Sequence, residues 1–216
     1  MERRTALNRL RGISAEERAG VFYPTTWTRH PDEAWTLRKV LRRLLEHERE
    51  HTGQVVEILR QRRGVLLAEL AAARRELLAA LAALPSDPPV PVCGEWTARD
   101  VLGHVADWEW VGVEGLRLLA QAKSPLVELV TDVDAWNREH VAARRDQVWE
   151  TVLEDLHAAR QALVDALESI DLSLLGRRFS FPWGGEGMPV AWLAVYPGHD
   201  REHARELSAA AGFRGC

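Results

Sequence analysis

The chain has 216 residues, of which 46% are hydrophobic and 28% charged, with a formal net charge of -4. These proportions are typical of a soluble globular protein, and the charge excludes a whole-protein electrostatic attraction to nucleic acid or to an anionic membrane. Two cysteines are too few for a disulfide framework, and no uninterrupted apolar run approaches about 18 residues. No apolar signal core follows the start of the chain. We therefore expect a cytoplasmic protein that has no nucleic-acid or membrane partner.

The first part of the chain predicts an irregular segment followed by helix. Residues 1–34 are polar and turn-prone, whereas almost every residue of 35–84 is compatible with helix. Basic residues directly before Gly64 are typical of a helix end, so we predict two helices, 35–63 and 65–84, with one continuous helix as the alternative. Segment 35–64 holds eight Lys/Arg and four Glu, a local charge of +4, which leaves -8 for the remainder. Such charges usually indicate a solvated helix face.

Three further helices are predicted in the middle and at the end of the chain. Pro85–Pro91 is a connector that cannot be helical, and Thr97 with Asp100 resembles a capping box that begins a helix at 98–122. Lys123-Ser124-Pro125 ends that helix, and a short helical turn is expected near Trp136. Residues 147–170 have the period of an amphipathic helix. Residues 177–188 indicate a hairpin or loop, after which Pro189 begins the last helix.

Histidines interrupt the apolar stripes of two predicted helices. His199 and His203 lie one turn apart in the stripe of the last helix, and His104 lies in that of helix 98–122. Buried imidazoles are costly unless a partner satisfies their ring nitrogens. From the residues alone, a shared metal ion and hydrogen-bonded core histidines explain the pair at positions 199 and 203 about equally well. Pro197-Gly198 predicts a kink, with His199 near the start of the second segment.

The predicted helix 35–63 repeats the pattern of the last helix at a constant offset of 152 residues. His47 falls on His199 and His51 on His203, and the apolar positions of the two stripes also correspond. The match suggests that this N-terminal arm derives from the last helix of a second, truncated domain, and chance similarity between charged helices is the alternative. His47-Glu48-Arg49-Glu50-His51 also matches the His-Glu-x-x-His pattern of zinc peptidases, but the sequence offers no convincing third ligand downstream.

Two sequence motifs resemble those of the DinB-like superfamily. The first is Trp96–Glu109 (WTARDVLGHVADWE), and the second is Val190–Leu193 followed by His199–His203 (VAWL and HDREH). The resemblance implies an all-α fold, a four-helix bundle of DinB type over residues 65–216, with an additional N-terminal helical arm over 1–64. It also implies that a divalent metal is bound by His104, His199 and His203 inside one end of the bundle.

Three neutral imidazoles leave coordination positions open, which is typical of a catalytic metal site. Zn or Ni is the expected metal, with Fe, Mn or Cu possible. The superfamily resemblance implies a small-molecule substrate, which could be a low-molecular-weight thiol, and a thiol-dependent S-transferase or hydrolase. Asp107, Asp200 and Glu202 are candidate bases or residues that orient the ligands, and the alternative for each is an ordinary surface carboxylate. A non-catalytic metal-binding bundle that acts through dimerisation or partner binding is the other function considered. A homodimer is expected because the arm needs an apolar surface to cover.

Overall fold

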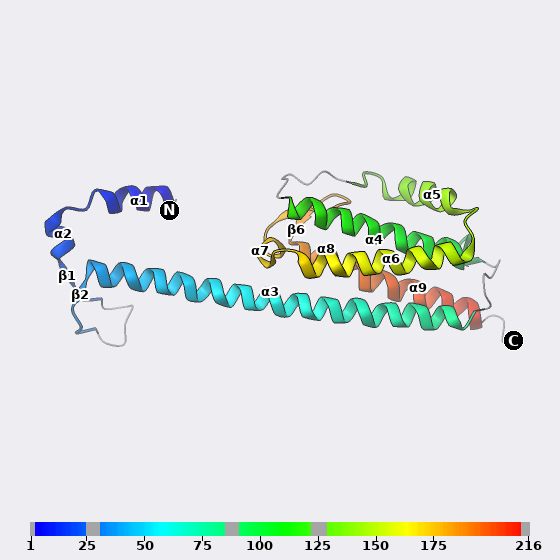
Figure 1. The fold of residues 1–216 in the computed structure, drawn as a ribbon, viewed down its shortest axis with the longest axis horizontal. Helices are drawn as coiled ribbons and strands as arrows, with labels where there is room; N and C mark the ends of the chain where they lie inside the picture. The colour runs from blue at the N-terminus through cyan, green and yellow to red at the C-terminus, as the bar shows by residue number, and fades with distance from the viewer. Residues whose placement is uncertain (1–2, 25–30, 85–90, 122–128, 213–216) are drawn as a thin grey trace. The chain divides into compact units, whose positions relative to one another are not determined.

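The computed structural model describes residues 3–24, 31–84, 91–121 and 129–212, and these are mostly helical (Figure 1). They divide into two compact units, residues 1–55 and residues 56–216. One helix, α3 (Leu37–Ala82), contributes to both units. No helix in the described ranges is both long enough and apolar enough to cross a membrane.

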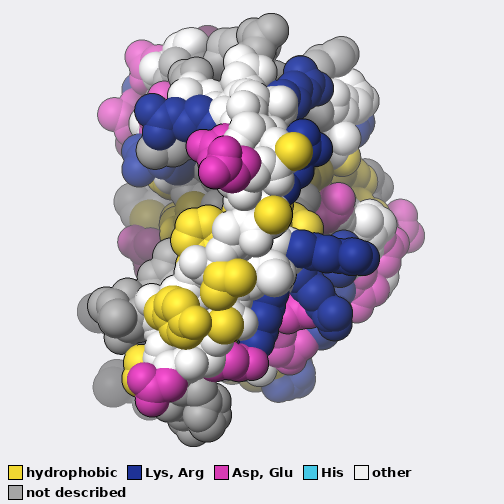
Figure 2. Space-filling model, turned by 90° about the vertical axis from the view of Figure 1, so that its left-hand side faces the viewer, with side chains coloured by type: hydrophobic (Ala, Val, Ile, Leu, Met, Phe, Trp, Pro, Cys, Tyr) yellow, Lys and Arg dark blue, Asp and Glu magenta, His cyan; other side chains and the backbone are white. Residues whose placement is uncertain are grey.

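The N-terminal unit contains more regular structure than its sequence predicts. Residues 1–34 were expected to be irregular, but α1 (Arg3–Arg11) and α2 (Ala15–Ala19) form there. A capping box between Ser14 and Glu17 begins α2 and explains the difference. Strands β1 (Val21–Phe22) and β2 (Trp35–Thr36) then pair antiparallel before α3 begins. Hydrophobic side chains lie exposed among charged ones on the face drawn in Figure 2, and the large exposed apolar residues of this unit include Val21, Phe22 and Tyr23.

Helix α3 is continuous through Gly64, so the prediction of two helices is wrong and its alternative is right. A helix that ends at glycine normally places that glycine in the left-handed region, and among the described glycines only Gly94, Gly184 and Gly185 have positive φ. Leu59 and Leu66, on the two sides of Gly64, are buried in the same core cluster. This burial outweighs the cost of about 1 kcal/mol that glycine imposes on a helix interior.

The C-terminal unit is a four-helix bundle made by the second half of α3, α4 (Ala98–Ala120), α6 (Trp149–Ser169) and the pair α8 (Pro189–Leu193) and α9 (Val195–Gly212). The predicted helices at 98–122 and 147–170 are confirmed within two residues. Thr97 and Asp100 form the capping box of α4 in both directions. The core of the bundle consists of buried aliphatic and aromatic side chains, among them Leu70, Leu77, Leu102, Leu156, Leu163, Trp192 and Leu207.

Shorter elements complete the C-terminal unit. The helical turn expected near Trp136 is a twelve-residue helix, α5 (Val133–Arg144), capped by the side chain of Asp132. The predicted hairpin is present, because β5 (Phe179–Ser180) pairs antiparallel with β6 (Glu186–Gly187). Strands β3 (Pro91–Cys93) and β4 (Trp96–Thr97) precede α4, and the small helix α7 (Leu172–Leu175) follows α6. Most of the predicted connector, residues 85–90, and Lys123-Ser124-Pro125 lie outside the described residues.

The last helix is divided as predicted, but at a different residue. The interruption falls at Ala194, between α8 and α9, rather than at Pro197-Gly198. Pro197 occupies the first turn of α9, where its missing N–H would have had no partner in the helix. His199 and His203 therefore share one regular helical segment, which fixes their relative orientation.

Candidate metal centre

The structure brings the three predicted ligand histidines together. His104 extends from α4, and His199 and His203 extend from α9. The Nε2 atom of His199 lies 3.0 Å from that of His104 and 3.0 Å from that of His203. Within the described part of the chain, these three form the only group of three or more His, Cys, Asp or Glu side chains whose ligand atoms converge in this way.

The donor set fits a divalent metal. A neutral Nε2 atom is either a hydrogen-bond donor or an acceptor, so hydrogen bonds among three converging Nε2 atoms satisfy them only in part. A zinc ion bound tetrahedrally at about 2.0–2.1 Å places its ligand nitrogens about 3.3 Å apart. The observed separations of 3.0 Å are close to that value. A cation in the centre would therefore satisfy all three atoms with little movement.

Burial favours the neutral form of His104 and His199, which is the form that binds metals. It lowers the pKa of His104 to about 3, and the neighbouring His203 contributes to this shift. Burial also lowers the pKa of His199 well below its ordinary value, and the two other histidines add to the effect. The Nδ1 atom of His203 lies 2.7 Å from Oε2 of Glu206, one turn later on α9. That carboxylate accepts the Nδ1 proton and directs the Nε2 lone pair toward the centre of the triad.

A cavity of about 270 Å³ adjoins the triad. Its wall combines two of the triad histidines with mostly apolar and aromatic side chains from α4, α5, the β5–β6 hairpin and α9: His104, Trp108, Val133, Asn137, Trp183, Val195, Tyr196 and His199. The indole N–H of Trp108 donates to Oδ1 of Asn137 at 3.0 Å, which fixes one wall. The cavity is large enough for a small molecule or for one end of a larger one.

Two of the predicted carboxylates are held by arginines. Arg144 on α5 donates to both oxygens of Asp107, at 2.8 and 2.5 Å, and Nδ1 of His140 lies 3.5 Å from the same carboxylate. Asp200 is only 1% exposed and accepts from Arg74 and Arg160. Glu202, the third, lies on the exposed face of α9. None of the three joins the convergent ligand group.

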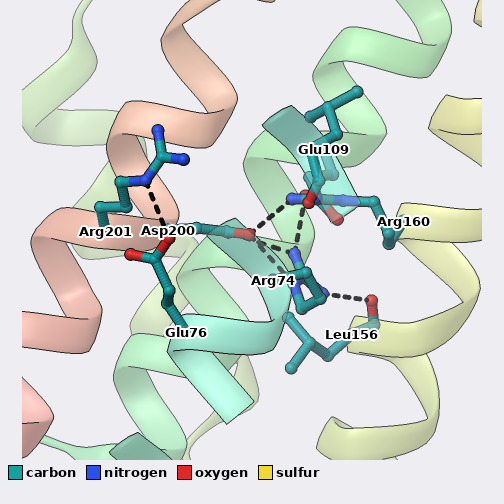
Figure 3. Close-up of polar contacts among 8 residues, drawn as sticks. Arg74, Glu76, Glu109, Leu156, Arg160, Asp200 and Arg201 are labelled. Atoms are coloured by element: carbon teal, nitrogen blue, oxygen red, sulfur yellow. Dashed lines mark hydrogen bonds and ion pairs between the residues drawn. The ribbon is translucent and has the colours of Figure 1, made fainter. Parts of the chain in front are cut away.

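Asp200 belongs to a buried ionic network that joins all four bundle helices (Figure 3). Arg74 on α3 donates to Asp200 at 3.1 Å, to Glu109 on α4 at 2.7 Å and to the carbonyl oxygen of Leu156 on α6 at 3.0 Å. Arg160 on α6 donates to Asp200 at 2.8 Å and to Glu109. Two positive and two negative side chains balance, and the network fixes α9 at the residue that follows His199.

Sequence reasoning missed Glu206 and this ionic network. Each network residue interrupts an apolar stripe, as Arg74 does between Leu70 and Leu77, and Arg160 between Leu156 and Leu163. A charged residue inside an apolar stripe therefore indicates that a buried partner exists. It does not indicate which residue that partner is. For Glu206 the available signal was its position three residues after His203, which places it on the same helix face.

Cys93 lies near Glu206 but lacks the character of a nucleophile. Burial, followed by its hydrogen bond to Glu206, raises the pKa of this thiol to about 11. The thiol is therefore protonated near neutral pH, and only a thiolate is strongly nucleophilic. Its hydrogen bond provides a second contact to the carboxylate that orients His203.

The fold and the site define an all-α four-helix bundle in which histidines of the second and fourth helices meet. The chain belongs to the DinB superfamily, which it matches over residues 69–207. The resemblance and the fold class expected from the sequence are thereby confirmed.

Individual proteins agree with this assignment. A protein of Bacillus cereus (strain 03BB102) named "putative metal-dependent hydrolase" is 28% identical over 123 residues, which are 57% of this chain and 68% of that relative. The solved structure of YfiT from Bacillus subtilis, described as a probable metal-dependent hydrolase with an unusual four-helix bundle topology, matches with a TM-score of 0.54 and 18% identity over 71% of this chain and 87% of YfiT. A mycothiol-dependent maleylpyruvate isomerase matches with a TM-score of 0.58 and 12% identity over 69% of this chain. The match covers 60% of the isomerase, and at such identities both structures show the fold alone.

Proposed function

We propose that this chain is a metal-dependent enzyme that acts on a small molecule, as a thiol-dependent S-transferase or as a hydrolase. The observation that carries the proposal is the convergence of three imidazoles, two of which line a cavity of about 270 Å³. A structural metal site is normally closed by four protein ligands, whereas three ligands beside a cavity leave room for a substrate.

The histidines at positions 104, 199 and 203 would hold the metal, with Zn or Ni as the first candidates and Fe, Mn or Cu as the others. When bound, such a metal acidifies a coordinated water or thiol, or polarises a substrate carbonyl. The chain's own residues would do the rest. Glu206 holds the tautomer of His203, and the Trp108–Asn137 pair and Trp183 exclude water from one side of the cavity.

The three predicted carboxylates receive different roles in this proposal. Asp200, held by two arginines, would position α9 and therefore His199. Asp107, which is bonded by Arg144, would position α5 and the cavity wall that α5 contributes. Glu202 lies exposed on α9 and could act as a base only toward a substrate that extends out of the cavity.

The names of similar proteins support the reaction classes. Relatives in Bacillus are named as metal-dependent hydrolases, and a structural neighbour is a mycothiol-dependent isomerase. We also propose the domain organisation expected from the sequence, an arm over residues 1–64 and a DinB-like bundle over 65–216. The boundary between the two compact units lies between residues 55 and 56, a little before the proposed boundary in the sequence.

The test compares metal-free and zinc- or nickel-loaded full-length protein in two assays, conjugation of a small thiol to an electrophile and hydrolysis of activated amides. We expect turnover only in the loaded protein, and its loss in His203→Ala. His157→Ala, which changes an exposed histidine on α6, is the matched control and should retain full activity. Equal rates with and without metal would refute the proposal. Tight metal binding without turnover in either assay would favour a non-catalytic metal-binding bundle.

A further inference from the structure

A second pair of histidines lies on α3, in the N-terminal unit. The Nε2 atoms of His47 and His51 are 3.1 Å apart, and both side chains are exposed. The Nδ1 atom of His51 lies 2.9 Å from Oε1 of Gln54, one turn later. The bundle triad does not use these residues.

The pair reproduces the ligand arrangement of α9 in detail. At the offset of 152 residues, Gln54 falls on Glu206, so the residue that orients the second histidine is also repeated. The Nε2–Nε2 separation is 3.1 Å on α3 and 3.0 Å on α9, and the contact from Nδ1 to the orienting oxygen is 2.9 Å and 2.7 Å. An amide oxygen accepts the Nδ1 proton as a carboxylate does, which leaves Nε2 free to bind a metal. Helix α3 therefore presents two prepared ligands.

Among the residues that the structure describes, the pair has no third ligand. On α9, His104 of the neighbouring helix α4 completes the set. In the described ranges, the bundle triad is a convergent group of three possible ligands, and no such group includes His47 or His51. Two imidazoles on one helix hold a divalent ion weakly, so a stable site here needs ligands beyond those that the described residues of one chain supply.

We propose that His47 and His51 are half of a second metal site, which a second copy of this chain completes with its own two histidines. Four imidazoles give the closed tetrahedral set that is typical of a structural zinc site, and two-fold symmetry supplies the missing pair without any further residue. The proposal is independent of the enzymatic function proposed for the bundle.

The surface around His47 and His51 is suited to contact with a second copy of this chain. Leu44 and Val55 lie on the same helix face and are 44% and 54% exposed, whereas their counterparts in α9, Tyr196 and Leu207, are 2% and 0% exposed. One short apolar stripe on each helix buries far less than the roughly 1,000 Å² of a stable interface. Association should therefore depend on the metal.

Sedimentation velocity of the full-length protein tests the proposal. Metal-free protein should be monomeric, and Zn²⁺ should convert it to a dimer that binds half an ion per chain more than the double variant His47→Ala/His51→Ala. The double variant should stay monomeric with zinc while keeping its bundle site and its helical circular dichroism. His157→Ala should dimerise as the unchanged protein does.

Co²⁺ provides an independent readout, because tetrahedral coordination by four imidazoles has a characteristic visible absorption. The double variant should lack this contribution and keep only the absorption of cobalt at the bundle site. Three results would overturn the proposal: a wild-type chain that stays monomeric with zinc, a dimer that forms without metal, and a double variant that still dimerises. Because the double variant retains the bundle histidines, failure here leaves the bundle proposal standing, and failure of bundle activity leaves this one standing.

Discussion

The buried ionic network allows a quantitative prediction for Glu109→Gln. Glu109 is 0% exposed, and its arginine partners Arg74 and Arg160 are 6% and 8% exposed. With Asp200 they form a set of two positive and two negative charges. The substitution keeps the shape of the side chain and one acceptor oxygen, but it leaves a net positive charge inside the bundle.

The expected loss follows from the cost of leaving a charge unpaired. Removing one partner of a buried ion pair destabilises a protein by about 3–5 kcal/mol. Because glutamine still accepts one hydrogen bond, we expect the lower end, about 3 kcal/mol. For a chain of this size, each kcal/mol lowers the melting temperature by about 2–4 °C, so a decrease of about 6–12 °C is predicted.

Thermal and urea unfolding followed by circular dichroism measure this difference. Glu57→Gln is the matched control, because Glu57 pairs with Arg60 on the surface of α3 and its side chain is 51% exposed. Exposed pairs contribute about 0–1 kcal/mol, so this variant should unfold almost as the unchanged protein does. If Glu109→Gln cost less than about 1 kcal/mol, or no more than the control, the charge-balance reasoning would be refuted.

Three further predictions concern the site and its packing. Glu206→Ala should weaken zinc affinity about 10–100-fold in a competition titration without changing the circular dichroism, since it removes the group that orients His203; unchanged affinity would remove Glu206 from the site. Metal-free protein should lose stability as pH falls from about 6.5 toward 5.5, because unfolding frees His104, whose folded pKa is about 3, to take up a proton near its ordinary pKa of 6.5. The slope is at most about 1.4 kcal/mol per pH unit for each such histidine, and urea unfolding that is flat over this window would contradict burial of the neutral rings. Gly112→Ala places a Cβ 2.5 Å from the Tyr196 hydroxyl and should cost about 1–3 kcal/mol, whereas Gly64→Ala, with nothing within 4 Å, should stabilise α3 by about 0.5–1 kcal/mol; equal effects in thermal unfolding would contradict the packing.

Local signals in the sequence predicted much of the fold. The Thr97–Asp100 capping box and the helical period of 147–170 gave the bounds of α4 and α6 within two residues, because both signals act over one or two turns. The continuity of α3 was misjudged, since burial of Leu59 and Leu66 against distant residues decides it. The helix propensity of the residues around Gly64 does not depend on that contact and so could not predict it.

The candidate site was also predictable from local signals only in part. The spacing of His199 and His203 showed that they share a helix face, but only the family resemblance joined them to His104, which is 95 residues away in the sequence. The arginine partners of Asp107 and Asp200 come from α3, α5 and α6, so no local pattern could have identified them. Trp183 reaches the cavity from a hairpin whose position depends on the finished bundle.

The central claim is that one ion is shared by His104, His199 and His203. Anomalous diffraction at the zinc edge, from crystals of zinc-loaded full-length protein, tests it most directly. The account predicts an anomalous peak about 2.0–2.1 Å from all three Nε2 atoms, facing the cavity. Crystals with no peak at the triad, or with a zinc ion that contacts only one of the three rings, would contradict it.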